Sequence, residues 1–176
     1  MLLNTFVFLS LGLFVTFTPY KAYEGKGTGL CKMQMPVSYH KVRRCLENHP
    51  ELDSIEKFLP ELPPDFRLKY TLIHKSRSLQ KATPELPRVI MYGKVNFQFV
   101  LAFNGDATLD KDDKFSLNGG KSLEMIQWNH EEKDFEFYEI TLDKKISYSN
   151  KNPQSCFQCH GGHTLRPNWQ HYRDWP

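Results

Sequence analysis

The residues best suited to chemistry stand near the C-terminal end, where Cys156-Phe157-Gln158-Cys159-His160 places two thiols three positions apart and a histidine directly after the second. This spacing is the one through which c-type haem is attached to a chain. Each sulfur forms a thioether with a haem vinyl group, and the adjacent imidazole coordinates the iron. Positions three apart share a helix face, so both thiols reach one edge of the macrocycle. We predict that Cys156 and Cys159 attach one covalent haem and that His160 is its iron ligand.

Two other chemistries use the same cysteines. With His163 and His171, the pair Cys156 and Cys159 supplies two thiolates and two imidazoles, which suit a closed tetrahedral zinc site. That arrangement gives no purpose to the histidine directly after the second cysteine. A thiol–disulfide redox pair is the other alternative, although these cysteines lie near the C-terminus and not after an early strand of a βαβ unit. We favour haem attachment over both of these alternatives.

The residues after the motif extend the pattern. Together, Ser155–Gly162, Arg166-Pro167-Asn168-Trp169, Tyr172 and Trp175-Pro176 resemble a group of exported, c-type cytochrome-like bacterial proteins, in which a haem motif precedes an Arg-Pro-x-Trp stretch. The resemblance covers residues 155–176. It implies that Cys156 and Cys159 are attachment points and that His160 is the proximal ligand.

The second axial position of the iron has no obvious ligand. Small cytochromes c take a methionine from well downstream of the motif, but no methionine follows Met125 here. The candidates are His163, His171, Met91, Met125, His74 and His130. For each of them we favour core packing or a surface role over ligation. An iron without a distal ligand would be open to small molecules.

Other residues of the C-terminal segment also have two interpretations. Arg166 is a candidate partner for a haem propionate, because a guanidinium pairs bidentately with a carboxylate, but it is equally well an exposed arginine. The stripe of Trp169, Tyr172 and Trp175 could cover a haem edge, although we favour ordinary core packing.

An export signal is expected at the other end of the chain, because haem attachment takes place outside the reducing cytoplasm. Thr5–Phe17 is an almost uninterrupted apolar run, shorter than the roughly 20 residues that span a membrane. We predict a signal peptide over residues 1–22 and a periplasmic or secreted protein. An uncleaved membrane anchor is the alternative, since no Lys or Arg precedes the run and the residues around Ala22 suit cleavage poorly.

Charge and cysteine count limit the partners and the compartment. The net charge is +3 with acids and bases interspersed, which argues against nucleic acid and for a solvated mixed surface. We expect a redox partner protein, and a membrane only if the N-terminal segment is retained. The remaining pair, Cys31 and Cys45, is expected to form a structural disulfide. It would close a loop of about 15 residues, for which chain entropy predicts about 3 kcal/mol of stabilisation.

The middle of the chain predicts short helices followed by strands. Val42, Cys45 and Leu46 follow helical spacing, with Pro50 as a stop. A second short helix is expected from a cap at Asp53 through Leu59, ended by Pro60, Pro63 and Pro64.

Beyond these helices the apolar period changes to two, which is typical of strands. We expect strands over Leu68–His74, Val89–Tyr92 and Val95–Phe103, and a hairpin over Leu123–Leu142 with its turn at Asn129–Asp134. In the second arm of the hairpin, the apolar parity changes between Phe137 and Tyr138. A β-bulge there would reconcile the two halves.

The chain is therefore predicted to have an α+β fold with short N-terminal helices, an antiparallel β-rich body of five or six strands and a short C-terminal helical haem-attachment segment. The expected divisions are residues 1–22, 23–150 and 151–176, the last cut short after Trp175-Pro176. The favoured function is an exported c-type haem protein that transfers electrons. A haem peroxidase or small-molecule sensor, a binding module with an accessory haem and a zinc-binding structural module are the alternatives. Enzyme activity is undecided, and no site for hydrolase or transferase chemistry is evident.

Overall fold

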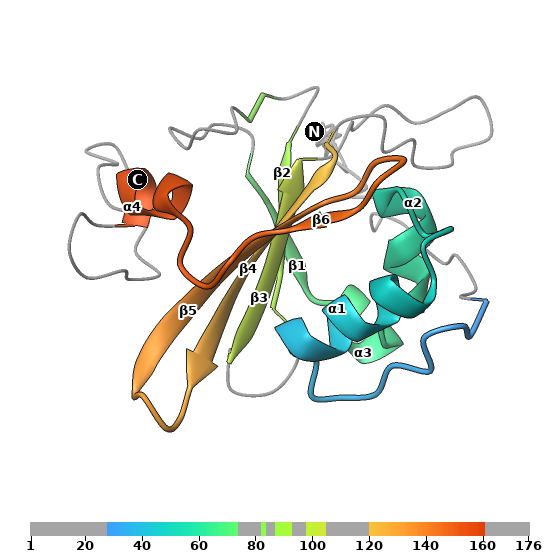
Figure 1. The fold of residues 1–176 in the computed structure, drawn as a ribbon, viewed down its shortest axis with the longest axis horizontal. Coiled ribbons are helices and arrows are strands. Elements are labelled where there is room, and N and C mark those ends of the chain that lie inside the picture. The colour runs from blue at the N-terminus through green and yellow to red at the C-terminus, as the bar shows by residue number, and fades with distance from the viewer. Residues whose placement is uncertain (1–27, 74–81, 84–86, 93–97, 105–119, 161–176) are drawn as a thin grey trace, which may run out of the picture.

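The fold is an antiparallel sheet with helices on both sides, seen in a computed structural model that describes residues 28–73, 82–83, 87–92, 98–104 and 120–160. The sheet has six strands in the order β1-β2-β3-β4-β5-β6, so each strand pairs with its neighbours in sequence. Figure 1 shows α1–α3 on one side of the sheet and α4 on the other. The predicted α+β class and strand number are confirmed.

The N-terminal helices are α1 (Tyr39–Asn48), α2 (Ile55–Phe58), the 3-10 helix η1 (Leu59–Glu61) and α3 (Pro64–Arg67). The strands are β1 (Tyr70–Ile73), β2 (Arg88–Met91), β3 (Phe99–Asn104), β4 (Ser122–Asn129), β5 (Asp134–Thr141) and β6 (Ser147–Tyr148). The last element is α4 (Gln154–His160).

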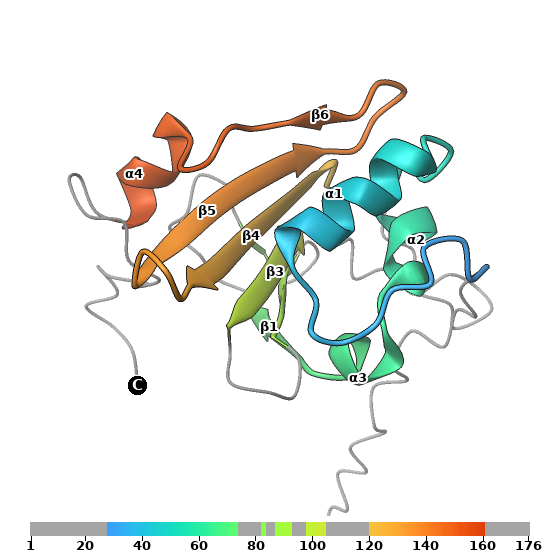
Figure 2. The ribbon, with the colours of Figure 1, turned by 60° about the horizontal axis from the view of Figure 1, so that its bottom comes forward.

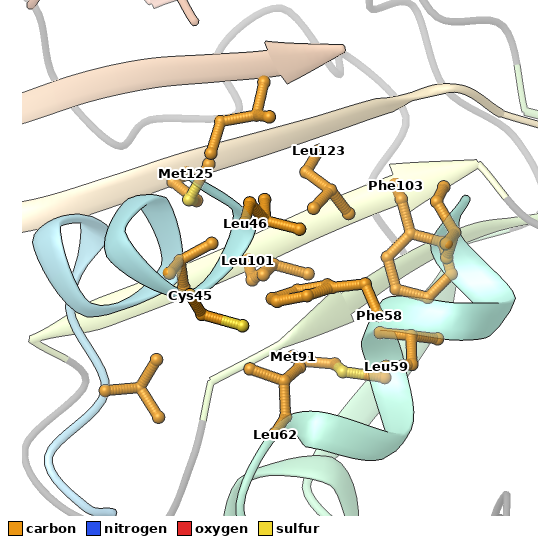
Figure 3. Close-up of a cluster of buried hydrophobic side chains, with 14 of the residues drawn as sticks. Cys45, Leu46, Phe58, Leu59, Leu62, Met91, Leu101, Phe103, Leu123 and Met125 are labelled. Carbon is orange, nitrogen blue, oxygen red and sulfur yellow. The ribbon is translucent and has the colours of Figure 1, made fainter. Parts of the chain in front are cut away.

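The main hydrophobic core lies between the sheet and α1–α3. Alternate residues of the central strands point toward these helices, because successive side chains of a strand lie on opposite faces. The sheet contributes Val89, Met91, Phe99, Leu101, Phe103, Leu123, Met125, Tyr138 and Ile140. In Figure 3, Leu46 and Phe58 from the helices meet Leu101 and Phe103 from β3. We call this face of the sheet the helix side.

The opposite face, which we call the α4 side, carries the other alternate residues. Val100 pairs with Ile126, and Ile126 pairs with Phe137, so these side chains form a second, smaller apolar cluster. Cys156 and Phe157 of α4 pack against that cluster. Figure 2, turned by 60°, again shows α4 and α1 on opposite sides of β5. The sheet is therefore covered differently on its two faces.

The bulge predicted between Phe137 and Tyr138 is wrong. β4 and β5 pair without interruption from Ser122–Thr141 to Asn129–Asp134, with the turn where it was expected. Both halves of β5 are apolar because Phe137 faces the α4 side while Tyr138 and Ile140 face the helix side. A strand with two covered faces needs no bulge to bury both sets.

The helix boundaries also differ from the prediction. The side chain of Ser54, not Asp53, caps α2 by accepting the Lys57 N–H. Pro60 lies within η1, and Pro64 is the first residue of α3, where proline suits the helix because its missing N–H would have no partner. A proline in the sequence can mark the end of one helix or the first turn of the next, so the sequence did not reveal α3.

The predicted disulfide is present, because Cys31 and Cys45 are bonded with their Cα atoms 5.1 Å apart. Glu61 holds the same N-terminal segment against the helices: its buried carboxylate accepts hydrogen bonds from Thr28 and from the Cys31 N–H, at 2.7 and 3.1 Å. Burial raises the pKa of Glu61, but these hydrogen bonds lower the pKa by a larger amount. The net pKa therefore lies below the ordinary value.

A second buried carboxylate, Glu136, lies at the hairpin end of the helix side. It accepts hydrogen bonds from the Tyr138 hydroxyl at 3.0 Å and the Asn129 amide at 2.8 Å. Burial raises the pKa of Tyr138, and the Glu136 carboxylate raises it further. The Tyr39 ring stacks on Tyr138, with centroids 3.7 Å apart. This network joins α1 to the sheet.

Several sequence predictions lie outside the described residues. They concern the signal or anchor over residues 1–22, part of the strand at Val95–Phe103, the ligand candidates His74, His163 and His171, and the C-terminal residues Arg166, Trp169, Tyr172 and Trp175. None of the helices in the described ranges has the length and apolar content needed to cross a membrane.

Candidate functional site

Helix α4 carries the cysteine–histidine motif and lies where a short helix after Asn152-Pro153 was predicted. The Cys156 N–H donates to the Pro153 carbonyl at 2.9 Å, which starts the first turn. Asn152 fixes the preceding loop to β5, because its side-chain oxygen accepts the Phe137 N–H at 2.9 Å. The Asn152 N–H also donates to the Phe137 carbonyl at 2.8 Å, so a side-chain and a backbone hydrogen bond attach the chain to the sheet just before the motif begins.

Two of the three predicted site residues line one pocket. Cys156 and His160 are one helical turn apart and so share a face of α4. The His160 ring lies 4.7 Å from the Phe137 ring, between centroids, at an angle of 44°. Cys159 lies in the same helix, and its side chain is outside the described part.

The pocket lies between α4 and the α4 side of the sheet. Its cavity volume is about 20 Å³, which is room for about one water molecule and well below the size of an ordinary ligand pocket. Its walls are formed by Arg88, Val100, Ala102, Glu124, Met125, Ile126, Phe137, Tyr138, Cys156 and His160. Strands β2 to β5 all contribute, so the pocket extends across the middle of the sheet.

One wall of the pocket is charged. Arg88, whose side chain is 3% exposed, forms an ion pair with Glu124, which is 31% exposed. The two residues come from β2 and β4, and β3 lies between these strands. Because a buried ion costs several kcal/mol unless it is paired, the guanidinium needs this carboxylate.

The residue types at this site are ones that bind haem, but the hollow between them does not have room for a porphyrin. In the Cys-x-x-Cys-His pattern, Cys156 corresponds to one of the two cysteines that attach haem, and His160 corresponds to the proximal iron ligand. Val100, Ala102, Ile126 and Phe137 line the hollow with apolar side chains, and Arg88 and Glu124 add a charged wall.

Three of the candidate distal ligands lie in the described part. Met91 and Met125 belong to the core on the helix side, as Figure 3 shows, with 6% and 1% exposure. His130 lies in the exposed hairpin turn, with its ring 6.4 Å from that of Trp128. Core packing for the methionines and a surface place for His130 are therefore confirmed.

Sequence reasoning missed Arg88 and Glu124. A single charge in a strand is normally read as solvent-exposed, since charged residues are rarely buried without a partner. Their pairing depends on which strands are neighbours, which no local pattern contains. The only signal is the position of Arg88 beside an apolar run, Val89–Tyr92.

Comparisons with known proteins give no match. No family model matches the chain, and neither a curated protein nor a solved structure matches it significantly. Among the described residues, no group of three or more His, Cys, Asp and Glu side chains is arranged to hold a metal ion. The zinc alternative needs His163 and His171, which are not among those residues.

Proposed function

We propose that this chain is an exported c-type haem protein that carries one covalent haem for electron transfer. The observation that carries the proposal is the convergence of Cys156 and His160 on one pocket against the α4 side of the sheet. A Cys-x-x-Cys-His motif on an exposed tail would have had no surface to bind a porphyrin. Here it stands on a helix that the sheet already contacts.

The residues of the pocket would have distinct roles. Haem, when bound, supplies the one-electron chemistry of its iron. Cys156 and Cys159 would tether it, and His160 would donate an imidazole nitrogen to the iron. Phe137 and Ile126 would exclude water from one ring face, which influences the reduction potential through the local dielectric.

The disulfide supports export, because disulfides persist in oxidising compartments and are rare in the cytosol. Cys31 and Cys45 are far from the motif in the sequence, and they are bonded on the helix side. The two pairs of cysteines therefore have separate uses under this proposal, one for stability and one for the cofactor.

The first experiment is expression with export in a host that has haem-attachment machinery. We expect the purified protein to gain the mass of one haem and to give a pyridine haemochrome spectrum of a thioether-linked haem. A polypeptide that carries only its own mass, or zinc without a Soret band, would contradict the proposal.

A haem sensor or peroxidase is the second candidate, favoured by one observation. Within the described ranges, Met91 and Met125 are committed to the helix-side core, and His130 lies in the hairpin turn. An iron without a strong distal ligand binds small molecules. Carbon monoxide distinguishes the two candidates: a reduced spectrum that it leaves unchanged favours electron transfer, and a shifted Soret band favours the sensor or peroxidase.

A further inference from the structure

Helix α4 and the chain that leads to it are attached to the sheet in different ways. The Ser149 N–H donates to the Glu139 carbonyl at 2.9 Å, and the Ser149 hydroxyl accepts the Glu139 N–H at the same distance. The Asn152 N–H and side-chain oxygen bond in the same way to the Phe137 carbonyl and N–H, at 2.8 and 2.9 Å. In Figure 2 this stretch continues from β6 toward α4. Hydrogen bonds therefore fix the chain along β5 as far as Asn152.

The attachment changes at Asn152-Pro153. Asn152 has a φ of 54°, in the left-handed region that asparagine adopts more readily than most residues. Pro153 has no N–H to donate to β5. The Cys156 N–H donates to the Pro153 carbonyl at 2.9 Å, and this bond belongs to the first turn of α4. Asn152-Pro153 thus separates a hydrogen-bonded extension of the sheet from a short helix.

Helix α4 rests on the sheet through a small apolar contact. Cys156 and Phe157 pack against the cluster of Ile126 and Phe137, and the His160 ring lies 4.7 Å from that of Phe137. The helix has seven residues, and helices of that length are marginal in water without tertiary packing. Short elements with few buried apolar contacts open separately from the core of a protein. The position of α4 and its helical structure therefore both depend on this contact.

The hollow under α4 disagrees with the cofactor that the motif predicts. Its cavity volume is about 20 Å³, which holds about one water molecule, whereas small-molecule pockets measure about 300 Å³ or more. Cys156 and His160 both line this hollow. A porphyrin attached at Cys156 and Cys159 and bound by His160 needs far more space on that side of the helix. The described position of α4 and an attached porphyrin therefore exclude each other.

We propose that α4 is a hinged cover: it turns away from the sheet about Asn152-Pro153, and it must do so before a porphyrin is attached. The second part of the inference rests on the proposed function. In the closed position, α4 keeps Cys156 and His160 against the sheet. Opening exposes the motif together with the cluster of Ile126 and Phe137, while the chain as far as Asn152 and the helix-side core stay in place.

Hydrogen exchange tests the opening without any cofactor. The protein is exported in a host that lacks haem-attachment machinery and studied by residue-resolved NMR. We expect the backbone N–H groups of α4 to exchange about tenfold faster, or more, than those in the middle of β4 and β5. The Phe137 N–H, which is bonded to the Asn152 side chain, should exchange slowly with the strands.

Two matched variants on α4 sharpen this measurement. Phe157→Ala removes part of the apolar contact but keeps the Cys-x-x-Cys-His motif, so exchange in α4 should become about tenfold faster while β5 is unchanged. Ser155→Ala changes an exposed residue of the same helix and should have no effect. If α4 exchanges no faster than β4 and β5, or if Phe157→Ala matches Ser155→Ala, the hinged cover is disproved.

The haem-loaded protein tests the second part. Without haem, the rings of His160 and Phe137 should give a nuclear Overhauser effect, because they are in contact. In reduced, haem-loaded protein saturated with carbon monoxide, whose iron is diamagnetic, we expect this signal to be lost. If it is retained, the inference is overturned and the proposed function stands. If the wild type takes no haem, the proposed function fails, and the exchange rates alone decide whether α4 opens.

Discussion

The two faces of the sheet are covered in different ways. On the helix side, helices α1–α3 and the disulfide enclose an extended cluster of buried side chains. On the α4 side, a small apolar cluster adjoins an open pocket that contains an ion pair, a cysteine and a histidine. Close packing on the helix side stabilises the fold, whereas the α4 side keeps a small hollow beside its charged residues.

The largest effect should come from removing both thiols on the α4 side. We expect the double variant Cys156→Ala/Cys159→Ala to lose covalent haem completely, since no thioether can form, while the disulfide and the helix-side core keep the fold. Intact-protein mass spectrometry after export measures the attachment. Ser155→Ala, an exposed change on the same helix, should retain haem. Covalent haem in the double variant would contradict the assignment.

The largest loss of stability should come from the helix side. Phe58 is fully buried, so we expect Phe58→Ala to lower the free energy of unfolding by about 3–5 kcal/mol. Phe135→Ala, on the half-buried α4 side, should cost clearly less. Urea denaturation of the two variants measures the difference between the faces. Equal losses would show that the α4 side contributes as much to stability as the helix side.

Removing the disulfide should have the next largest effect. The Cys31–Cys45 bond spans a sequence separation of 14, and loss of a loop of that size costs about 3 kcal/mol by the chain-entropy estimate. We expect Cys31→Ala/Cys45→Ala to lower the urea midpoint accordingly. Mass spectrometry of the unreduced wild-type protein should show a peptide that joins the two residues. Two free thiols at these positions would contradict the structure.

Glu61 should have a smaller and pH-dependent effect. Its carboxylate accepts hydrogen bonds from Thr28 and the Cys31 N–H, so Glu61→Gln should cost about 1–2 kcal/mol at neutral pH. Its pKa lies below the ordinary value of 4.5 when folded, because the hydrogen bonds outweigh the effect of burial. The unfolded chain then binds the proton more readily, and the stabilisation is present above pH 4.5.

That stabilisation is lost as the pH falls through the lower, folded pKa. Urea midpoints between neutral and acid pH should therefore converge for wild type and Glu61→Gln. Glu47→Gln is the matched control, because Glu47 pairs with Arg43 at the surface, where such pairs contribute about 0–1 kcal/mol. A difference at Glu61 that does not change with pH would rule out the carboxylate as its source.

Local patterns predicted the elements that depend on neighbours in the chain. The strands, the hairpin turn at Asn129–Asp134 and the apolar face of α1 follow from period and turn residues, which act within a few positions. The error at Phe137 and Tyr138 has a specific cause: a period-two pattern assumes one covered face, and β5 has two. The prolines also led to a wrong helix boundary, because Pro64 begins α3 where the end of a helix was expected.

The chain by itself specified the Cys-x-x-Cys-His spacing, the pairing partner for Cys31 and the alternation of the strands, because each is a matter of residue type and short-range position. Only the tertiary structure decided that α4 lies across the sheet from α1–α3, and that Arg88 and Glu124 meet in its pocket. Their contact depends on the pairing of β2, β3 and β4. Strand order is set by the packing of the whole sheet, so the ion pair could not be found from either residue's own neighbourhood.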